Sequence, residues 1–437
     1  MATAAVLLAG CTSSTGSTGS GAFDANDKKI SGTVNWVGWS PTVEEAPAYI
    51  AAFNKVYPNV KVNFKLTQYQ DYGASLRPAL ASGAGPDVFD IQPGLITQQY
   101  GQYAIDLNGA AEQVLPGRKN KIAANGVHAF DYKGEVVGLS IGSGPAGQIW
   151  YNKDLFDKYG LTPPKTLDEW VHVCKVFKVG NVNCFVQGAQ EEWVNQDVVQ
   201  AIANSYSPGK FREAVDGKIK WTDPDLMAAF TTWKELFKDG VMQQGATGIN
   251  AYPDADNMWL SGKAAMVNFG TWNLPRVKKS TLAPLVKALD PNGTVFAALP
   301  MAFPDVAGRG HPSTLFGDAD YGIAVNRNSR NKAAATAFAT WWTLTKEGQQ
   351  YIADTLDEVP SLKGITPGPQ DLVDPKTQSD VVAQVISEAQ AVEEPRQIMY
   401  PDLLNALGDT MSAIATGQLS VADAVNRLQS VSDGIQR

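Results

Sequence analysis

Hydrophobic and polar residues alternate along the first ninety residues in a pattern that predicts strands and helices in turn. Val60, Val62 and Phe64 alternate with lysine and asparagine, which indicates a strand buried on one face. Ile50 and Phe53 recur at the spacing of one helical face. The predicted elements are, in order, the strand 33–37, a helix that begins between Thr42 and Pro47, the strand 60–66, the helix 69–80 and the strand 87–91. This βαβαβ order predicts a sheet with helices packed on its faces.

The stretch 138–161 is the centre around which the rest of the chain is organised. A predicted strand, 136–141, runs into a segment dense in glycine and proline, and a second predicted strand, 148–151, follows. A short helix then extends from Asn152 and ends at Gly160. Glycine-rich backbone between two strands is typical of a chain that leaves one packed unit and enters another, so we expect a crossing between domains here.

Two enzyme motifs fall within this centre. Residues 138–142 match the GxSxG pattern of a nucleophilic serine, and residues 142–147 match the GxGxxG pattern of a dinucleotide site. Both patterns require a helix directly after the motif, either to expose the serine or to direct amide groups at a pyrophosphate. Because a strand is predicted from Gln148 instead, we interpret both matches as accidental.

The remainder of the chain continues to mix helices and strands. Thr166 and Ser420 each begin a capping box, and Asp223 precedes a first-turn proline, so helices are expected to start at these residues. The predicted helices are 166–177, 223–240, 254–260, 332–345, 380–392, 402–416 and 421–432, and the predicted strands are 264–269, 295–299 and 321–325. This order predicts the α/β class, and the sequence contains no internal repeat.

The length, the net charge and the distribution of apolar residues limit which kinds of protein this chain can be. A chain of 437 residues is too long for one ordinary core, so two large lobes or about three small domains are expected. The net charge of −8 argues against nucleic acid as a partner, because phosphate binding needs clustered Lys and Arg. No apolar run approaches the roughly 18 residues of a membrane span.

Beyond the two matches interpreted above as accidental, the sequence contains no complete metal-binding or cofactor-binding motif. The three histidines lack a metal-binding spacing. Asp254, Asp256 and Asn257 resemble the start of a calcium loop, but the glycine and the terminal glutamate are missing, so helix capping is the preferred interpretation. We therefore expect no metal and no cofactor.

The amino-terminal residues resemble a lipoprotein signal. A short apolar core, 4–8, leads into residues 8–11 (Leu-Ala-Gly-Cys), which are similar to the lipobox in which the cysteine becomes lipidated. No Lys or Arg precedes the core, and the core is shorter than that of a usual signal peptide. We expect Cys11 to be lipidated and residues 1–29 to form the signal and a Ser/Thr/Gly-rich tether; the alternative is a frayed terminus with a chance cysteine.

The other two cysteines, Cys174 and Cys184, form an even pair in a chain that looks exported. Cys174 is predicted late in a helix and Cys184 on the strand that follows. A disulfide across that turn is expected, and two buried free thiols remain the alternative.

Several short segments, taken together and in order, resemble extracellular solute-binding protein family 1, the maltodextrin-binding-like substrate-binding lipoproteins of sugar ABC importers. The segments are 53–58, 81–88, 150–156, 160–166, 262–266, 270–272, 299–300 and 347–348. Each is weak alone, but together they extend over nearly the whole chain. The lipobox and tether agree with the anchoring habit of that family.

This resemblance implies an architecture and a mechanism. The implied fold is α/β, the two-lobed periplasmic-binding-protein fold of type II (Venus-flytrap), with the ligand cleft between the lobes. Lobe 1 would comprise 30–143 plus 321–358, and lobe 2 would comprise 146–318 plus 361–437. The protein would be a monomer that binds a carbohydrate and docks on ABC permease transmembrane subunits. It would be lipid-anchored on the extracellular face of the cytoplasmic membrane, or periplasmic.

The same resemblance suggests where the ligand would bind. A sugar offers an apolar face and a rim of hydroxyl groups, so its site needs aromatic rings together with carboxylates or amides. Trp272 matches the family position at which an aromatic ring stacks on sugar. The full set of candidates is Trp39, Gln92, Glu192, Trp193, Trp272, Asp318 and Tyr400. For each aromatic residue, packing in the hydrophobic core is the alternative.

Two other functions stay open at this point. An exported carbohydrate-active enzyme of the glycosidase type would need two carboxyl groups across a cleft, which sequence alone does not exclude. A surface adhesin would bind without ligand-driven closure.

Overall fold

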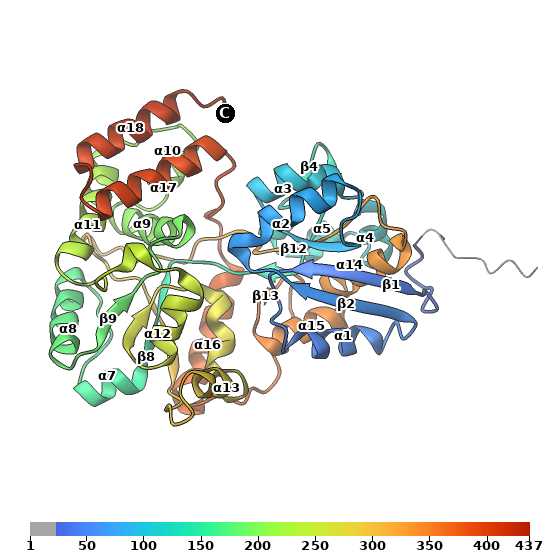
Figure 1. Cartoon of the computed structure of the whole chain (residues 1–437), viewed down its shortest axis with the longest axis horizontal. Coiled ribbons are helices and arrows are strands. Elements are labelled where there is room, and N and C mark those ends of the chain that lie inside the picture. Colours follow the sequence, from blue (N-terminus) through green and yellow to red (C-terminus); the bar gives the residue numbers. More distant parts are fainter. Residues whose placement is uncertain (1–22) are drawn as a thin grey trace, which may run out of the picture.

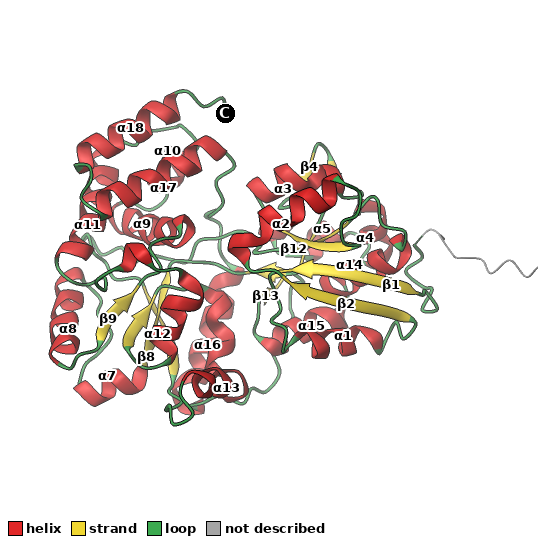
Figure 2. Ribbon diagram, in the orientation of Figure 1, coloured by secondary structure: helices red, strands yellow, loops and turns green. Residues whose placement is uncertain are grey.

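The computed structural model describes residues 23–437, and the predicted lipidation site Cys11 lies outside them. Within this range the chain folds into two α/β lobes joined by crossing segments (Figure 1). Helices pack around the sheet of each lobe (Figure 2). The predicted two-lobed α/β fold is confirmed.

The sheet of the first lobe contains strands from both ends of the chain. Its order is β2 (Val60–Leu66), β1 (Gly32–Gly38), β3 (Val88–Ile91), β12 (Gly322–Val325) and β6 (Leu139–Ser140). The first three strands are parallel, whereas β12 runs antiparallel to both β3 and β6. The helices of this lobe are α1 (Ala46–Asn54), α2 (Tyr69–Ala81), α3 (Leu95–Tyr100), α4 (Asn108–Val114), α5 (Arg118–Lys121), α6 (Ala124–Val127), α14 (Lys332–Leu344) and α15 (Lys346–Thr355). A hairpin of β4 (Asp131–Tyr132) and β5 (Glu135–Val136) completes it.

The sheet of the second lobe has the order β11 (Ala298–Ala302), β8 (Gln148–Asn152), β10 (Ala264–Val267) and β9 (Asn183–Val186). The helices of this lobe are α7 (Lys153–Tyr159), α8 (Leu167–Val179), α9 (Glu192–Tyr206), α10 (Lys210–Val215), α11 (Pro224–Lys238), α12 (Asp256–Leu260), α13 (Lys279–Leu289), α16 (Pro375–Gln390), α17 (Pro401–Ala415) and α18 (Val421–Asp433). Asn152 caps α7 by accepting a hydrogen bond from the Leu155 amide (3.0 Å), and Thr166 caps α8.

Three crossings join the lobes, and we name them by residue range: the first is 142–147, the second is 316–320 and the third is 357–361. The strand β7 (Gly142–Ser143) pairs with β13 (Val359–Pro360), which bonds the first crossing to the third. Two isolated bridges, Ser143 with Ala319 and Ala146 with Phe316, bond the first crossing to the second. The crossings therefore form one hydrogen-bonded hinge rather than separate linkers.

Several predicted elements differ in their bounds. The strand expected over 136–141 is divided between the end of β5, which pairs with β4, and β6, which joins the first sheet. The strand expected at 295–299 lies at β11 instead, where it pairs in register with β8. The helix expected at 380–392 is α16, which begins earlier because Asp374 caps it ahead of a first-turn proline.

The two enzyme motifs lack the helix that each requires. The GxSxG match is followed by the first crossing, the GxGxxG match forms that crossing, and the strand β8 comes next. The Ser140 hydroxyl is buried and donates to the carbonyl oxygen of Gly142 (3.1 Å), so it is not presented as a nucleophile. The interpretation of both matches as accidental follows from this geometry.

A disulfide joins Cys174, on α8, to Cys184, on β9, with their Cα atoms 4.9 Å apart. The bridge ties a helix to the strand that follows it, across the short turn expected from the sequence. From residue 23 onward, no helix is both long enough and apolar enough to cross a membrane.

Candidate functional site

Aromatic and charged side chains from both lobes meet at the hinge, and we call this group the interlobe cluster. Lobe 1 supplies Tyr69 and Gln92, lobe 2 supplies Trp193, Trp272 and Arg396, and the crossings supply Asp320 and Glu358. These seven residues are far apart in sequence, so only the fold brings them together.

Trp272 follows β10 and lies over the backbone of Gly270. A Cβ atom at Gly270 would overlap the Trp272 ring and the carbonyl oxygen of Pro145, so the glycine allows the ring to fold back over the chain. The indole N–H of Trp272 donates to the Tyr252 hydroxyl (3.1 Å), and the Tyr252 ring stacks on Phe269 at 4.7 Å. Trp272 is therefore held in place while its ring remains partly exposed.

Trp193 lies at the start of α9 and contacts both lobes. Its ring is 5.9 Å from that of Trp272 and 6.5 Å from that of Tyr69, which belongs to lobe 1. The indole N–H of Trp193 is buried, and no acceptor among residues 23–437 takes its hydrogen bond. An unpaired buried donor next to aromatic faces is a feature that a polar ligand would satisfy.

Arg396 covers the two tryptophans of lobe 2. Its guanidinium carbon is 5.0 Å from the centre of the Trp272 ring and 5.6 Å from that of Trp193, which are cation–π distances. Its Nε and Nη2 atoms donate to the two oxygens of Asp197 at 2.6 and 2.9 Å. Burial lowers the pKa of Arg396, but the Asp197 carboxylate outweighs this and raises it, so the guanidinium stays charged.

Asp318, a predicted ligand contact, is hydrogen-bonded to the Arg396 segment. Its Oδ2 atom accepts from the backbone N–H groups of Arg396 (3.1 Å) and Gln397 (2.9 Å). The Gly317 amide also donates to the carbonyl oxygen of Glu394 (2.8 Å). The second crossing and the 394–397 segment are thus bonded together through Gly317 and Asp318.

Two carboxyl groups occupy the hinge side of the cluster. Glu358 and Gln92 are both within hydrogen-bonding reach of Asp320. Burial raises the pKa of Asp320, and burial together with Asp320 and Asp357 raises the pKa of Glu358 well above its usual value. Gln92 is fixed by the Tyr69 hydroxyl, which donates to its Oε1 atom (2.7 Å).

Trp39 lies at the end of β1, on the lobe 1 side of the cluster. Its ring packs edge-on against Tyr69 at 5.5 Å. Its backbone N–H donates to Oδ2 of Asp90 (3.0 Å), while Oδ1 of Asp90 accepts from the indole N–H of Trp36 (2.8 Å). Burial raises the pKa of Asp90 to about 8 despite these donors. Trp39 therefore buttresses Tyr69 and is itself supported by a buried acid.

The other two predicted contacts point elsewhere. Glu192 packs against Gly408 of α17, and burial with the nearby Asp409 raises its pKa. Tyr400 is the N-cap of α17, and the Arg437 guanidinium lies 5.4 Å from its ring centre. Neither side chain contacts a member of the interlobe cluster.

The structure thus joins Gln92, Trp193 and Trp272 in one cluster, with Trp39 beside it. The sequence analysis missed the members Tyr69, Asp320, Glu358 and Arg396, together with Asp197, the partner of Arg396. For Asp320 and Glu358 a signal was available, because each lies at an expected boundary between segments of the two lobes. For Asp197 and Arg396, 199 residues apart, the sequence offers no pattern that pairs them.

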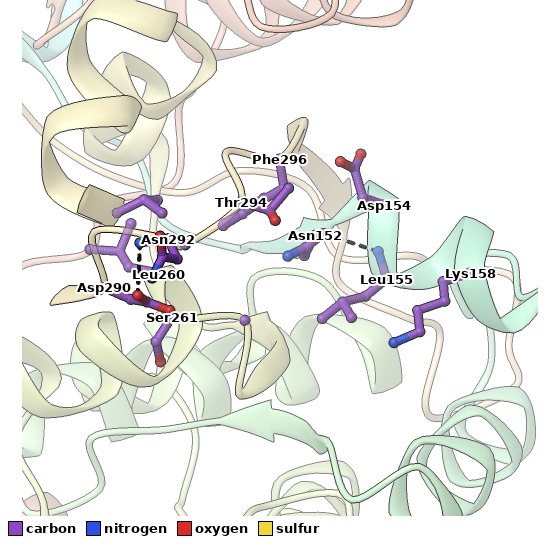
Figure 3. A pocket seen from close by; sticks show the side chains of 13 residues that line it. Asn152, Asp154, Leu155, Lys158, Leu260, Ser261, Asp290, Asn292, Thr294 and Phe296 are labelled. Carbon is purple, nitrogen blue, oxygen red and sulfur yellow. Dashed lines mark hydrogen bonds between the residues drawn. The ribbon is translucent and has the colours of Figure 1, made fainter.

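A separate surface cavity of about 400 Å³ lies in lobe 2 (Figure 3). Apolar side chains including Leu155 and Phe296 line it, and its rim includes Asp290, which already caps the Asn292 amide (2.9 Å). It contains no member of the interlobe cluster.

The calcium-like loop is explained by local pairing. Asp254 accepts from the Asn250 amide (3.0 Å), and Asp256 forms an ion pair with Arg276 (2.9 Å). Across residues 23–437, no group of three or more His, Cys, Asp or Glu side chains is arranged to hold a metal ion.

The chain is similar in sequence to known solute-binding and sugar-binding proteins. The family model described as bacterial extracellular solute-binding protein matches residues 39–349. The multiple sugar-binding protein of Streptococcus mutans is 25% identical over 300 residues, which is 67% of each chain. The melibiose/raffinose/stachyose-binding protein MelE of Bacillus subtilis is 23% identical and matches over 43% of each chain.

Solved structures show the same fold. Maltose-bound MalE3 of T. maritima superimposes with a TM-score of 0.73 at 19% sequence identity, covering 92% of this chain and all of its own. These two curated relatives are thus matched over 67% and 43% of their length, whereas the solved structure is matched almost throughout.

Proposed function

Because this chain belongs to the family of bacterial extracellular solute-binding proteins, we propose that it captures a sugar or oligosaccharide between its lobes for an ABC importer. Two relatives are named for the sugars they bind, and another relative is named as an ABC transporter extracellular-binding protein. The proposal extends those activities to this chain.

One observation carries the proposal: the interlobe cluster combines aromatic faces with unpaired polar atoms. Trp193 and Trp272 offer apolar surface to a sugar ring, and Tyr69 faces them from the other lobe. In the part of the chain that the structure describes, the Trp193 indole N–H and the Glu358 Oε2 atom are buried without partners. A sugar hydroxyl both donates and accepts, so it would satisfy both groups.

The mechanism requires binding but no chemistry. A ligand that contacts Tyr69 from lobe 1 and Trp193 from lobe 2 stabilises the closed arrangement by its differential affinity for it. The hydrogen-bonded crossings give the lobes a common hinge about which to move. The closed form would then dock on the permease subunits as a monomer.

The glycosidase alternative fits the hinge carboxyls poorly. Retaining enzymes hold their two carboxyl groups about 5 Å apart and inverting enzymes hold them farther apart. Asp320 and Glu358 are within hydrogen-bonding reach of each other, which leaves no room for a glycosidic bond between them. The matched family is also one of binding proteins.

We also propose that Cys11 is lipidated and anchors the protein on the outer side of the cytoplasmic membrane. The motive is the sequence Leu-Ala-Gly-Cys at 8–11 and the Ser/Thr/Gly tether after it. Cys11→Ser, in a chain expressed with its complete natural signal, is expected to move the protein from the membrane fraction to the soluble fraction. Unchanged fractionation would rule out the anchor.

A thermal-shift screen over mono- and oligosaccharides tests the central proposal, because a ligand that binds the native state raises its melting temperature. We expect at least one saccharide to raise the melting temperature and to bind in calorimetry with a stoichiometry of one. If no saccharide does so, the proposal is wrong. Turnover of an oligosaccharide by the pure protein would support the enzyme alternative instead.

A further inference from the structure

The carboxyl pair Asp320–Glu358 is incompletely satisfied by the chain itself. The Glu358 side chain is only 6% exposed, and no N–H or O–H group among residues 23–437 donates to its Oε2 atom. Two carboxyl groups within hydrogen-bonding reach share a proton, because both cannot be ionised at that distance. In the ligand-free protein, therefore, one of the two carboxyl groups keeps a proton, and this proton stands in for a hydrogen-bond donor that the chain does not supply.

The positive charge that acts on Asp320 is already engaged with another acid. Arg396 is the nearby cation, but two of its nitrogens are committed to Asp197. Asp357 adjoins Glu358 on the third crossing, so a further acidic group lies beside the pair. The polar side of the interlobe cluster thus carries more acid than base.

The aromatic side of the cluster already accommodates a cation. The Arg396 guanidinium rests over Trp272 and Trp193 at cation–π distances, which shows that these faces tolerate positive charge. The cluster therefore combines aromatic faces with a carboxyl pair that lacks hydrogen-bond donors. A protonated amine can donate to the carboxylates and is also attracted to the aromatic faces, so it fits this site better than a neutral hydroxyl does.

We propose that the preferred ligand is a saccharide that carries a protonated amino group, received by Asp320 and Glu358. This inference rests on the proposed sugar-binding function and specifies its substrate class. On binding, the ammonium N–H groups donate to the two carboxylates, and the proton shared by the pair leaves to solvent. The step is a proton release, and no bond between heavy atoms forms or breaks.

The test uses matched pairs of ligands that differ only in hydroxyl or amine. The pairs are glucose with glucosamine, galactose with galactosamine, and cellobiose with the β-1,4-linked glucosamine dimer. Affinities are measured by calorimetry on the full chain at about pH 6, where an amine keeps its proton. In at least one pair, the amine is expected to bind about tenfold tighter or more, since hydrogen bonds to charged groups are the stronger ones.

Two variants and a control assign the preference to the carboxyl pair. Glu358→Gln and Asp320→Asn each replace one ionisable carboxyl group by an amide of nearly the same shape, and Glu347→Gln makes the same chemical change at an exposed site on α15. The amine preference is expected to disappear in at least one folded variant and to persist in the control. Ligand-free melting temperatures show which variants are folded.

The outcomes separate this inference from the proposed function. Equal or weaker binding of the amine in every pair overturns the inference, as does a preference that persists in both carboxyl variants. If neutral saccharides alone bind, the proposed function stands and the amino specificity is wrong. If no saccharide of either kind binds, both fall.

Discussion

Asp197 and Arg396 form a bidentate ion pair across 199 residues of sequence, with N–O distances of 2.6 and 2.9 Å. Their side chains are 3% and 11% exposed, so both charges have left bulk water. The pair fixes the guanidinium over Trp272 and Trp193 and thereby orders the lobe 2 side of the interlobe cluster.

Breaking this pair from one side should be costly, because the remaining charge stays buried. Arg396→Met is expected to lower the free energy of unfolding by about 3–5 kcal/mol, whereas Arg396→Met combined with Asp197→Asn should recover much of the loss. Urea denaturation of the three proteins measures both effects. A single variant as stable as the parent would mean that the pair contributes nothing.

Stability should fall as pH rises from about 5 to 8. Burial raises the pKa of Asp90 to about 8 and, with the charge of Glu45, that of Asp357 to about 7. In the unfolded chain both carboxyls ionise near their usual pKa of about 3.9, so the folded state binds more protons between these values. The stabilisation is complete below the unfolded pKa and is lost as pH passes through the folded pKa.

Asp357→Asn is the matched test of this titration. Asp357 accepts hydrogen bonds from the hydroxyls of Tyr49 (3.1 Å) and Ser40 (3.4 Å). In the variant, each hydroxyl can donate to the amide oxygen or accept from the amide N–H group. The variant is expected to reduce the loss of unfolding free energy between pH 5 and 8 by on the order of 1 kcal/mol. An unchanged pH profile, measured by chemical denaturation, would contradict the assignment of Asp357.

Helices and strands with a clear hydrophobic period could be predicted from the sequence with accurate bounds. The helix α9 was not among the predicted helices, and its buried face shows why. The strand β2 and the helix α18 match their predicted ranges closely because each has one apolar face. The buried face of α9 instead carries amides and an acid. Gln196 donates to the carbonyl oxygen of Arg396, and Gln200 donates to Glu394, both at 2.7 Å.

The candidate site follows the same division. Trp272 could be located because a strand and a glycine precede it, and those are local signals. The other members of the cluster contact partners on distant segments of the chain, as Asp320, Glu358 and Arg396 do. No local sequence pattern shows which distant segments come together. Glu192 and Trp193 are adjacent in sequence, yet helical geometry at the start of α9 directs the first toward Gly408 and the second toward the hinge.

The disulfide should stabilise lobe 2 by closing a short loop. Cys174 and Cys184 are separated by 10 residues, for which chain entropy gives roughly 2–3 kcal/mol. The double variant Cys174→Ala/Cys184→Ala is expected to lose about that much unfolding free energy, and reducing agent should then have no further effect on it. Intact-mass analysis with alkylation that finds two free thiols in exported protein would remove the basis of this prediction.

Trp272 is expected to be a principal contact for the saccharide. Its ring is partly exposed and is held in place by the hydrogen bond to Tyr252, so it offers an ordered aromatic face. A buried aromatic anchor contributes about 2 kcal/mol or more, so Trp272→Ala should weaken binding on the order of thirtyfold. Trp272→Phe keeps an apolar ring and should retain more of the affinity.

A backbone variant tests the same ring without changing it. At Gly270 an added Cβ would collide with the Trp272 ring, whereas at Gly248 it would meet no atom within 4 Å. Gly270→Ala is therefore expected to weaken saccharide binding, and Gly248→Ala is expected to leave it unchanged. Calorimetric affinity and ligand-free melting temperature are measured for all four variants. Unchanged affinity in Trp272→Ala would remove this residue from the site, and a collapse of its ligand-free melting temperature would assign it to the hydrophobic core.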